Sequence, residues 1–282
     1  MSYRKKHVKN KIHGIKPKKS IFKRLWFWIL ILFFIIILSA FYAVLFYSGF
    51  QVKDILVSGN EKTKALELQS IVLDNINTEL VDFWKIRINS HSIFLVDLNK
   101  LNKNILEKFP VIEKIKINKN YPQTLALGIE ERKPIGAFCG NDNECFLIDG
   151  NGIIFEPVSA IPDNLTVVRR TLESSQVFIG EEVVAQNMID VVSKIQKNLK
   201  DNFQIGLKEA LIKSSVRLNV ETGENWQIYF DLDSGSDINL QLIKLNLLLN
   251  TEISQALRKN LYYIDLRPKD RAIICDNEIC GG

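Results

Sequence analysis

Residues 111–131 read VIEKIKINKNYPQTLALGIEE, and this stretch decides the fold of the region around it. Apolar and polar residues alternate in 111–118 and again in 124–131, which is the pattern of strands with one buried face. The connecting KNYPQ, at 119–123, is rich in residues that favour turns. The stretch therefore predicts two adjacent strands joined by a short turn.

The segments upstream predict the elements that complete this sheet. Residues 52–58 form a short strand, and the apolar positions of 66–76 and of 98–106 repeat at helical spacing. Asp97 precedes the second of these helices and can cap it, because its carboxylate can accept backbone N–H groups. A brief strand is predicted at 92–96, so the order is β-α-β-α-β-β, with two helices covering a small sheet.

A second, β-rich segment begins near Lys133-Pro134. Its predicted elements are strands near 135–139, 145–148 and 153–156, a helix at 184–199, a hairpin at 216–230, a helix from 238 to about 257, and strands at 261–266 and 272–275. The DGNG at 149–152 resembles a fragment of a calcium loop, but no acidic ligands follow at the required spacing, so we interpret it as a hairpin turn. The fold class is α+β, with two helices in this second domain.

An uncharged run at 25–46 reads LWFWILILFFIIILSAFYAVLF. As a helix it would extend roughly 33 Å, enough to cross a bilayer. A buried core helix is rarely apolar on every face over such a length, and the apolar part of a cleaved signal peptide is shorter. We predict an uncleaved membrane-spanning helix at 25–47.

The charges of the chain are divided unevenly. Residues 1–24 hold ten Lys/Arg and no Asp or Glu, so the 37 basic residues of the chain leave 27 beyond the tail, against 32 acidic residues. By the positive-inside rule the tail stays in the cytoplasm and the rest of the chain lies outside. The acidic body gives no reason to expect a nucleic-acid partner.

Four cysteines form two local pairs in the sequence, Cys139 with Cys145 and Cys275 with Cys280. Outside the membrane such pairs can oxidise to disulfides. The spacing is looser than that of most zinc sites, and sequence alone leaves disulfides, free thiols and zinc as alternatives.

The sequence predicts no catalytic constellation. A nucleophilic mechanism would use His91 beside Ser90 or Ser92, an awkward geometry without a G-x-S-x-G elbow. The adjacent Glu130 and Glu131 would point to opposite faces of a strand. Nucleotide-binding motifs are absent from the sequence, so we expect no enzyme activity, no cofactor, no metal and no small-molecule substrate.

A series of short motifs runs along most of the chain: 50–52, 58–60, 92–97, 109–114, YPQTL at 121–125, EERKPIGA at 130–137, 146–149, Gly152, Phe155 and IDLR at 264–267. In these residues, and in their order and spacing, the chain resembles the FtsQ/DivIB family of bitopic bacterial cell-division proteins, which carry a POTRA domain followed by a β-rich domain. Val111 and Tyr121 stand where relatives often have Trp, and Pro268 stands where some relatives carry an aromatic residue. The resemblance implies a basic cytoplasmic tail (1–24), the membrane helix (25–47), a POTRA domain (48–133), an FtsQ/DivIB-type β domain (134–275) and a C-terminal tail (276–282).

The resemblance also implies a function: a non-catalytic scaffold at the division septum of the bacterial plasma membrane, which binds partners of the FtsB/DivIC and FtsL type. An exposed final strand can accept another chain by strand addition. The residues expected at this contact are Tyr263, Asp265, Arg267, Ala272, Ile273 and Ile274. The alternatives are a membrane-anchored cell-wall hydrolase and a POTRA-type factor for outer-membrane assembly or secretion.

Overall fold

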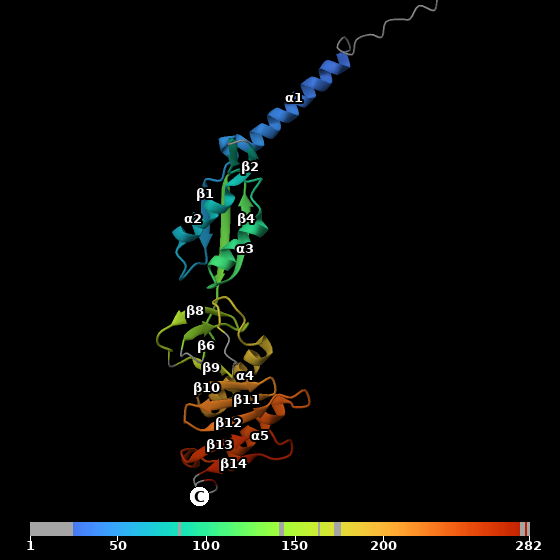
Figure 1. Ribbon diagram of the computed structural model, residues 1–282. Helices are drawn as coiled ribbons and strands as arrows, with labels where there is room; N and C mark the ends of the chain where they lie inside the picture. Colours follow the sequence, from blue (N-terminus) through green and yellow to red (C-terminus); the bar gives the residue numbers. More distant parts are fainter. Residues whose placement is uncertain are drawn as a thin grey trace, which may run out of the picture. The chain divides into compact units, whose positions relative to one another are not determined.

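The computed structural model describes residues 25–83, 86–140, 144–162, 164–171, 176–276 and 280. The chain divides into two compact units: residues 1–54, 76–96 and 120–124 form the first, and the remainder forms the second. The predicted basic tail (1–24) lies outside the described residues, as does most of the predicted C-terminal tail (276–282). The fold has the predicted α+β class, with an apolar N-terminal helix ahead of the β-containing regions (Figure 1).

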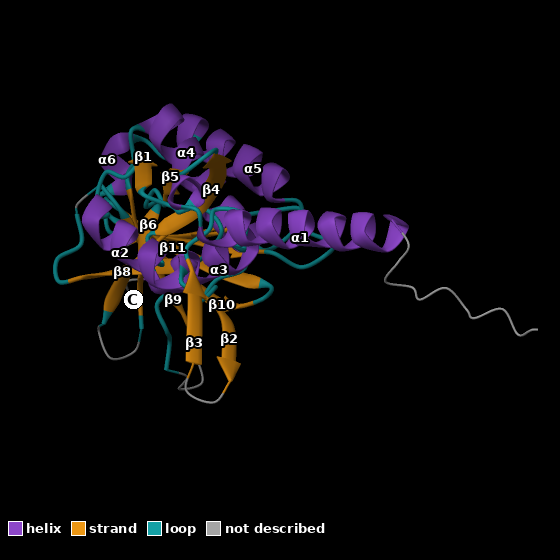
Figure 2. Ribbon diagram, turned by 90° about the horizontal axis from the view of Figure 1, so that it is seen from above, coloured by secondary structure: helices purple, strands orange, loops and turns teal. Residues whose placement is uncertain are grey.

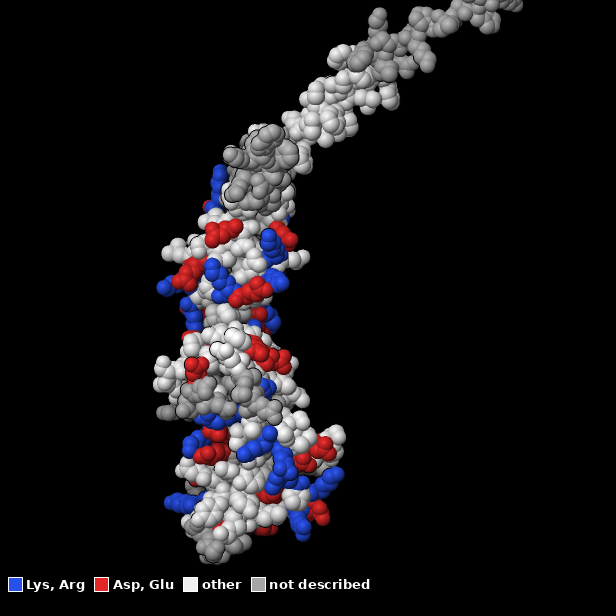
Figure 3. Space-filling model, in the orientation of Figure 1, with Lys and Arg blue, Asp and Glu red and all other residues white. Residues whose placement is uncertain are grey.

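The first unit contains helix α1 (Leu25–Phe46), the short 3-10 helix η2 (Ser48–Phe50) and a hairpin of β2 (Thr78–Phe83) and β3 (Ile86–Ser90). Helix α1 is long and apolar enough to cross a membrane. Figure 3 shows it as a continuous surface without Lys, Arg, Asp or Glu. Nearly all of its side chains are at least partly exposed; within the helix only Leu45 is buried.

The second unit begins with a three-stranded sheet in the order β1 (Asp54–Ser58), β5 (Thr124–Glu131), β4 (Ile112–Asn120). The chain enters helix α2 (Ala65–Ile76) after β1 and helix α3 (Leu98–Lys108) before β4. The predicted cap of α3 is present, because Asp97 accepts hydrogen bonds from the backbone N–H groups of Asn99 and Lys100. The buried side chains of this region come from both helices and from the sheet: Leu68, Val72, Leu101, Ile105, Ile112, Leu125 and Leu127.

The strand predicted at 92–96 is wrong. Strand pairing there is limited to a single bridge between Gln51 and Ser92, and the backbone then turns, with the N–H of Leu95 donating to the carbonyl of Ser92. Ile93 and Val96 are buried, so their apolar side chains fill the interior from a turn. The prediction also missed two strands just upstream, β2 and β3.

A nine-stranded sheet follows, in the order β14-β13-β12-β11-β10-β9-β6-β7-β8. The strands are β6 (Gly136–Cys139), β7 (Cys145–Ile148), β8 (Ile154–Val158), β9 (Thr166–Arg170), β10 (Leu207–Ser214), β11 (Arg217–Thr222), β12 (Gln227–Asp231), β13 (Leu261–Asp265) and β14 (Ile273–Asp276). Most neighbours are antiparallel, but β9 runs parallel to both β6 and β10, and β13 runs parallel to β12. Figure 1 shows β9 to β14 following one another across the sheet.

Helices α4 (Gln186–Phe203) and α5 (Ile238–Thr251) contact each other and pack on this sheet (Figure 2). Their buried residues, Ile195 and Leu245 among them, join one hydrophobic cluster with the inward-facing residues of the strands. Trp226, Phe138 and Phe230 are the largest fully buried side chains of the cluster.

The helix predicted from 238 to about 257 is shorter in the structure. It ends at Thr251, and a four-residue helix α6 (Gln255–Arg258) follows, so this region has three helices where two were predicted. The backbone N–H groups of Glu252 and Ile253 both donate to the carbonyl of Leu248, which closes α5. Ser254 then caps α6 by accepting from the N–H of Leu257.

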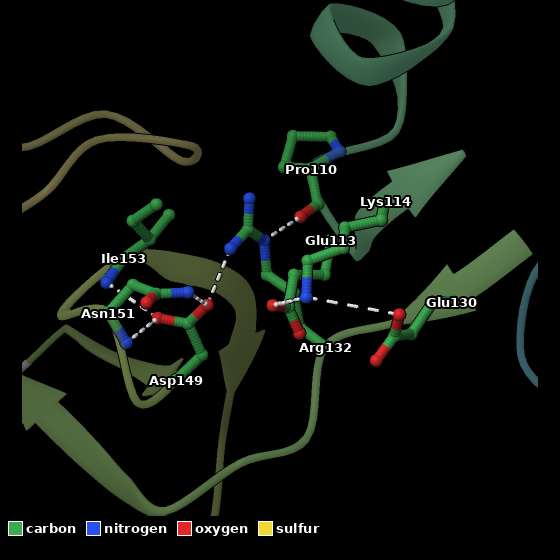
Figure 4. Close-up of polar contacts among 8 residues, drawn as sticks. All are labelled: Pro110, Glu113, Lys114, Glu130, Arg132, Asp149, Asn151 and Ile153. Atoms are coloured by element: carbon green, nitrogen blue, oxygen red, sulfur yellow. Dashed lines mark hydrogen bonds and ion pairs between the residues drawn. The ribbon is translucent and has the colours of Figure 1, made fainter. Parts of the chain in front are cut away.

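An ion pair joins the end of the three-stranded sheet to the nine-stranded sheet. Arg132, which follows β5, donates from Nη1 to the carboxylate of Asp149 at 2.5 Å and from Nε to the carbonyl of Pro110 at 2.9 Å (Figure 4). The other oxygen of Asp149 accepts the N–H groups of Asn151 and Ile153, which shapes the turn between β7 and β8. The DGNG segment is therefore a turn, as predicted, and its first residue also anchors Arg132.

Candidate partner-binding edge

Strand β14 is one edge of the nine-stranded sheet. It pairs antiparallel with β13, with Ile274 opposite Ile264 and Ile273 opposite Asp265. In the strand order of the described residues β14 ends the sheet, with β13 as its neighbour. An edge of this kind presents backbone N–H and C=O groups to which another chain can add.

The opposite edge, β8, is protected. The N–H of Ile154 donates to the carbonyl of Glu181, and the N–H of Gly180 donates back to the carbonyl of Ile154. Ile153 forms a further bridge with Glu182. Pro157 lies within β8 and has no backbone N–H to donate. The two edges therefore differ, and β14 is the one suited to strand addition.

The predicted contact residues lie on both faces of the sheet beside this edge. Ala272 and Ile274 are partly buried and pack against the core cluster, on the same side as the buried Ile264. Ile273 alternates with them and is exposed, with 44% of its surface accessible. The structure thus brings the predicted residues together on β13 and β14 and directly beside them, and divides them between the core side and the opposite face.

The opposite face carries a polar and aromatic cluster. Arg267 donates from Nε and Nη2 to the two carboxylate oxygens of Asp265, at 2.8 and 2.6 Å, and its backbone N–H donates to the same carboxylate. Tyr263 stacks on Tyr229 of the neighbouring strand with ring centroids 5.0 Å apart. The guanidinium carbon of Arg267 lies 5.4 Å from the centroid of the Tyr229 ring, within the range of a cation–π contact.

This cluster keeps Asp265 ionised. Burial alone would raise the pKa of Asp265, but the hydrogen bonds from the side chain and backbone of Arg267 outweigh it and hold the pKa below its usual range. Burial raises the pKa of the neighbouring Tyr229, so its hydroxyl stays protonated at neutral pH. The face beside β14 thus presents one internally neutralised ion pair and two phenol rings.

Sequence reasoning missed two residues that hold this region. Lys244 of α5 donates to the carbonyls of Pro268 and Arg271, at 2.5 and 3.0 Å, and so anchors the loop between β13 and β14. Tyr229 of β12 supplies the ring between Tyr263 and Arg267. A lone lysine in the Leu-rich helix INLQLIKLNLLLNT was the signal that could have identified Lys244.

Both cysteine pairs are disulfides in the structure. Cys139–Cys145 links the paired ends of β6 and β7. Cys275–Cys280 ties the end of β14 to the residue five positions later. The second bond therefore lies next to the candidate edge.

The carboxylates considered for catalysis have structural roles. Glu131 accepts hydrogen bonds from the backbone N–H groups of Lys62 and Thr63 at 2.8 to 3.1 Å, which holds the loop ahead of α2. Burial works to raise the pKa of Glu131, but these backbone donors lower it overall. Glu130 lies 3.9 Å from Lys114 on the exposed side of the sheet (Figure 4). The two carboxylates thus serve different contacts and do not converge on one site.

Comparisons with known proteins agree with the resemblance noted in the sequence. Residues 79–132 match the model of a family described as "POTRA domain, FtsQ-type". The chain is also similar to the cell division protein FtsQ of Agrobacterium fabrum (strain C58 / ATCC 33970), with 24% identity over 234 residues, which is 80% of this chain. The match spans 62% of the length of that relative. The two findings support the FtsQ/DivIB family, and the fold prediction of a POTRA-type domain followed by a β-rich region is confirmed.

Proposed function

We propose that this chain, whose similarities support the FtsQ/DivIB family, is a single-pass membrane protein of the bacterial divisome. Helix α1 has the length and composition of a membrane anchor. The name of the A. fabrum relative, a cell division protein, supports a role in division. In this proposal the protein is located in the plasma membrane at the division septum.

The orientation follows from the charges of the chain. The ten Lys/Arg of residues 1–24 keep the tail in the cytoplasm, and α1 carries the regions that follow to the outside. Disulfides form and persist in oxidising compartments outside the cytoplasm, so the two cysteine pairs are consistent with this orientation.

The partners are bitopic division proteins of the FtsB/DivIC and FtsL type, which bind by adding a strand to β14. The single observation that carries this proposal is the contrast between the unprotected edge at β14 and the protected edge at β8. Backbone hydrogen bonds supply the affinity in this mode of recognition, and side chains at alternate positions supply the specificity. Ile273 offers an apolar contact, and the pair Asp265–Arg267 and the ring of Tyr263 offer polar and aromatic contacts that set the register.

The protein acts as a scaffold without an enzymatic step or a cofactor. By holding its partners at the outer surface of the membrane, it assembles and regulates the machinery of septal peptidoglycan synthesis. Glu130 and Glu131, the carboxylates considered for catalysis, are used in separate structural contacts, as described above.

The test is co-purification of the full chain, in detergent micelles, with the ectodomain of a candidate FtsB/DivIC-type partner. A variant ending at Arg271 removes β14, and a matched variant ending at Asp276 keeps β14 but removes the residues beyond it, including Cys280. We expect the first truncation to abolish binding and the second to retain it. Circular dichroism of both variants verifies that the remaining fold is intact.

Binding that survives removal of β14 would contradict strand addition at this edge. Equal loss of binding in both truncated variants would place the contact in the terminal residues instead of the strand.

A further inference from the structure

The surface at the outer end of α1 has an unusual composition. Three segments of the first compact unit meet there: 42–52, 90–96 and 120–124, which we call the juxtamembrane patch. None of these residues is Asp, Glu, Lys or Arg, whereas 24% of the whole chain is charged. The second and third segments are distant in sequence from α1, so the fold itself brings them to the end of the helix.

The segment 90–96 is bonded directly to the last turn of α1. Ser92 Oγ donates to the carbonyl of Val44 at 2.7 Å, and Ser90 Oγ donates to the carbonyl of Leu45 at 2.6 Å. Gln51 Nε2 donates to the same carbonyl of Leu45 at 2.8 Å. Carbonyls at a helix end lack partners within the helix, and hydrocarbon supplies no donors, so these bonds satisfy groups that lipid would leave unpaired.

Four aromatic rings extend from this junction across the patch. The centroids of Tyr47 and Phe50 are 5.5 Å apart, those of Phe50 and Phe94 5.3 Å, and those of Phe94 and Tyr121 5.3 Å. Tyr47, Phe94 and Tyr121 remain exposed, with 59%, 44% and 61% of their surfaces accessible. Such a row of exposed rings is costly in water but favourable at the boundary between lipid headgroups and acyl chains.

We infer that the juxtamembrane patch is a membrane-binding surface, in which Tyr47, Phe94 and Tyr121 insert into the interfacial layer of the bilayer that α1 spans. This inference rests on the proposed membrane anchoring of α1. The occupant is a phospholipid surface because the patch is continuous with the anchor: Tyr47 follows Phe46, the last residue of α1, directly. The juxtamembrane patch is therefore held against the bilayer by its own aromatic rings as well as by its covalent connection to α1.

The test uses the full chain in phospholipid vesicles, with the photo-crosslinking residue p-benzoylphenylalanine at one position per variant. Tyr121 and Phe94 are the test positions, and replacing one aromatic residue with another preserves the packing. Leu66, at the start of α2, is the matched control, since it is an exposed apolar side chain outside the patch, 78% accessible. Leu30, inside α1, reports whether the helix is inserted. Adducts are identified by mass spectrometry.

We expect lipid adducts at Leu30, Tyr121 and Phe94, and none above background at Leu66. Adducts at Leu30 with none at Tyr121 or Phe94 would overturn the membrane-binding surface and leave the anchor intact. Adducts at Leu66 equal to those at Tyr121 would show that the patch has no preference for lipid, and protein–protein adducts at Tyr121 would assign the patch to another chain. A lack of adducts at Leu30 would overturn the anchor and the inference together.

Discussion

Arg132 and Asp149 form an ion pair that is almost entirely out of solvent, with 13% and 3% of their side chains exposed and 2.5 Å between Nη1 and the carboxylate. Each partner has further bonds: Arg132 reaches the carbonyl of Pro110, and Asp149 holds the N–H groups of Asn151 and Ile153. One ion pair therefore links the loop after α3, the end of β5 and the turn between β7 and β8.

Breaking this pair from one side should destabilise the protein strongly. For Arg132→Ala we expect a loss of about 3–5 kcal/mol in the free energy of unfolding, because Asp149 would remain buried without its cation. Urea unfolding of the full chain in micelles, followed by circular dichroism, measures the change. The control is Lys208→Ala, which removes an exposed pair with Glu221 and should lower the free energy of unfolding far less, because solvent screens that pair. Similar losses in the two variants would contradict this assignment.

The turn that contains Asp149 also requires glycine at position 152. Gly152 has φ of +77°, and a Cβ there would lie 1.7 Å from the carbonyl oxygen of Val184. Gly152→Ala should therefore cost more than about 2 kcal/mol, since it combines backbone strain with a backbone clash. Gly150→Ala is the matched control two residues away, where a Cβ meets nothing within 4 Å. In thermal melts Gly152→Ala should have a clearly lower melting temperature than Gly150→Ala. Equal melting temperatures would rule out the requirement for glycine at position 152.

The stability contributed by Asp265 should depend on pH. Its pKa is lower in the folded protein than in the unfolded chain, where it is about 3.9. The ionised carboxylate therefore stabilises the fold above that pH, and the contribution disappears as the pH falls through the folded pKa. At pH 7 we expect Asp265→Asn to cost about 1 kcal/mol, because the bidentate pair with Arg267 is only partly shielded from solvent.

Measuring unfolding at pH 7 and in steps below pH 4 tests this expectation. The difference between the wild type and Asp265→Asn should shrink as the solution becomes more acidic. Asp233→Asn, a change at an exposed carboxylate of the neighbouring loop, serves as the control and should alter stability little at either pH. If the two proteins differ in free energy of unfolding by the same amount at every pH, the loss of stability in Asp265→Asn arises from packing and not from charge.

The disulfide between Cys139 and Cys145 should stabilise the sheet. Closing a loop with a sequence separation of 6 restricts the unfolded chain and is worth about 2 kcal/mol. We expect Cys139→Ala/Cys145→Ala to lower the melting temperature accordingly. A reducing agent should lower the melting temperature of the wild type by more than that of the double variant, in which only the Cys275–Cys280 bond is left to reduce. A wild type that is insensitive to reductant would show that the bond is absent or contributes nothing.

The sequence predicted best those elements whose local pattern matches their final environment. The alternation in 111–131 gave β4 and β5, and Asp97 marked the start of α3, because each depends on neighbours a few residues away. Strand β9 escaped prediction because it is a short central strand, parallel to both neighbours, and those neighbours are 30 or more residues away along the chain. The apolar residues of 92–96 resemble a strand in their local pattern, but the side chains of Ile93 and Val96 enter the interior from a turn.

The candidate edge could be predicted in part, because some of its residues form a local pattern in the sequence. The IDLR segment and the last apolar strand identify the region, and the structure places Asp265, Arg267 and Ile273 together there. The contribution of Tyr229 depends on a strand pairing across more than 30 residues, and that of Lys244 depends on how α5 lies against the loop after β13. Such contacts are created by tertiary packing and leave little trace in the local sequence.

The unequal edges of the nine-stranded sheet set a limit on stoichiometry. A sheet with two open edges can continue indefinitely, because each added copy offers a new edge to the next one. Here the segment from Gly180 to Val183 covers part of the β8 edge, which leaves β14 as the edge at which the proposed strand addition would extend this sheet. In that mode the nine-stranded sheet takes one added strand, and copies joined edge to edge through this sheet are not favoured.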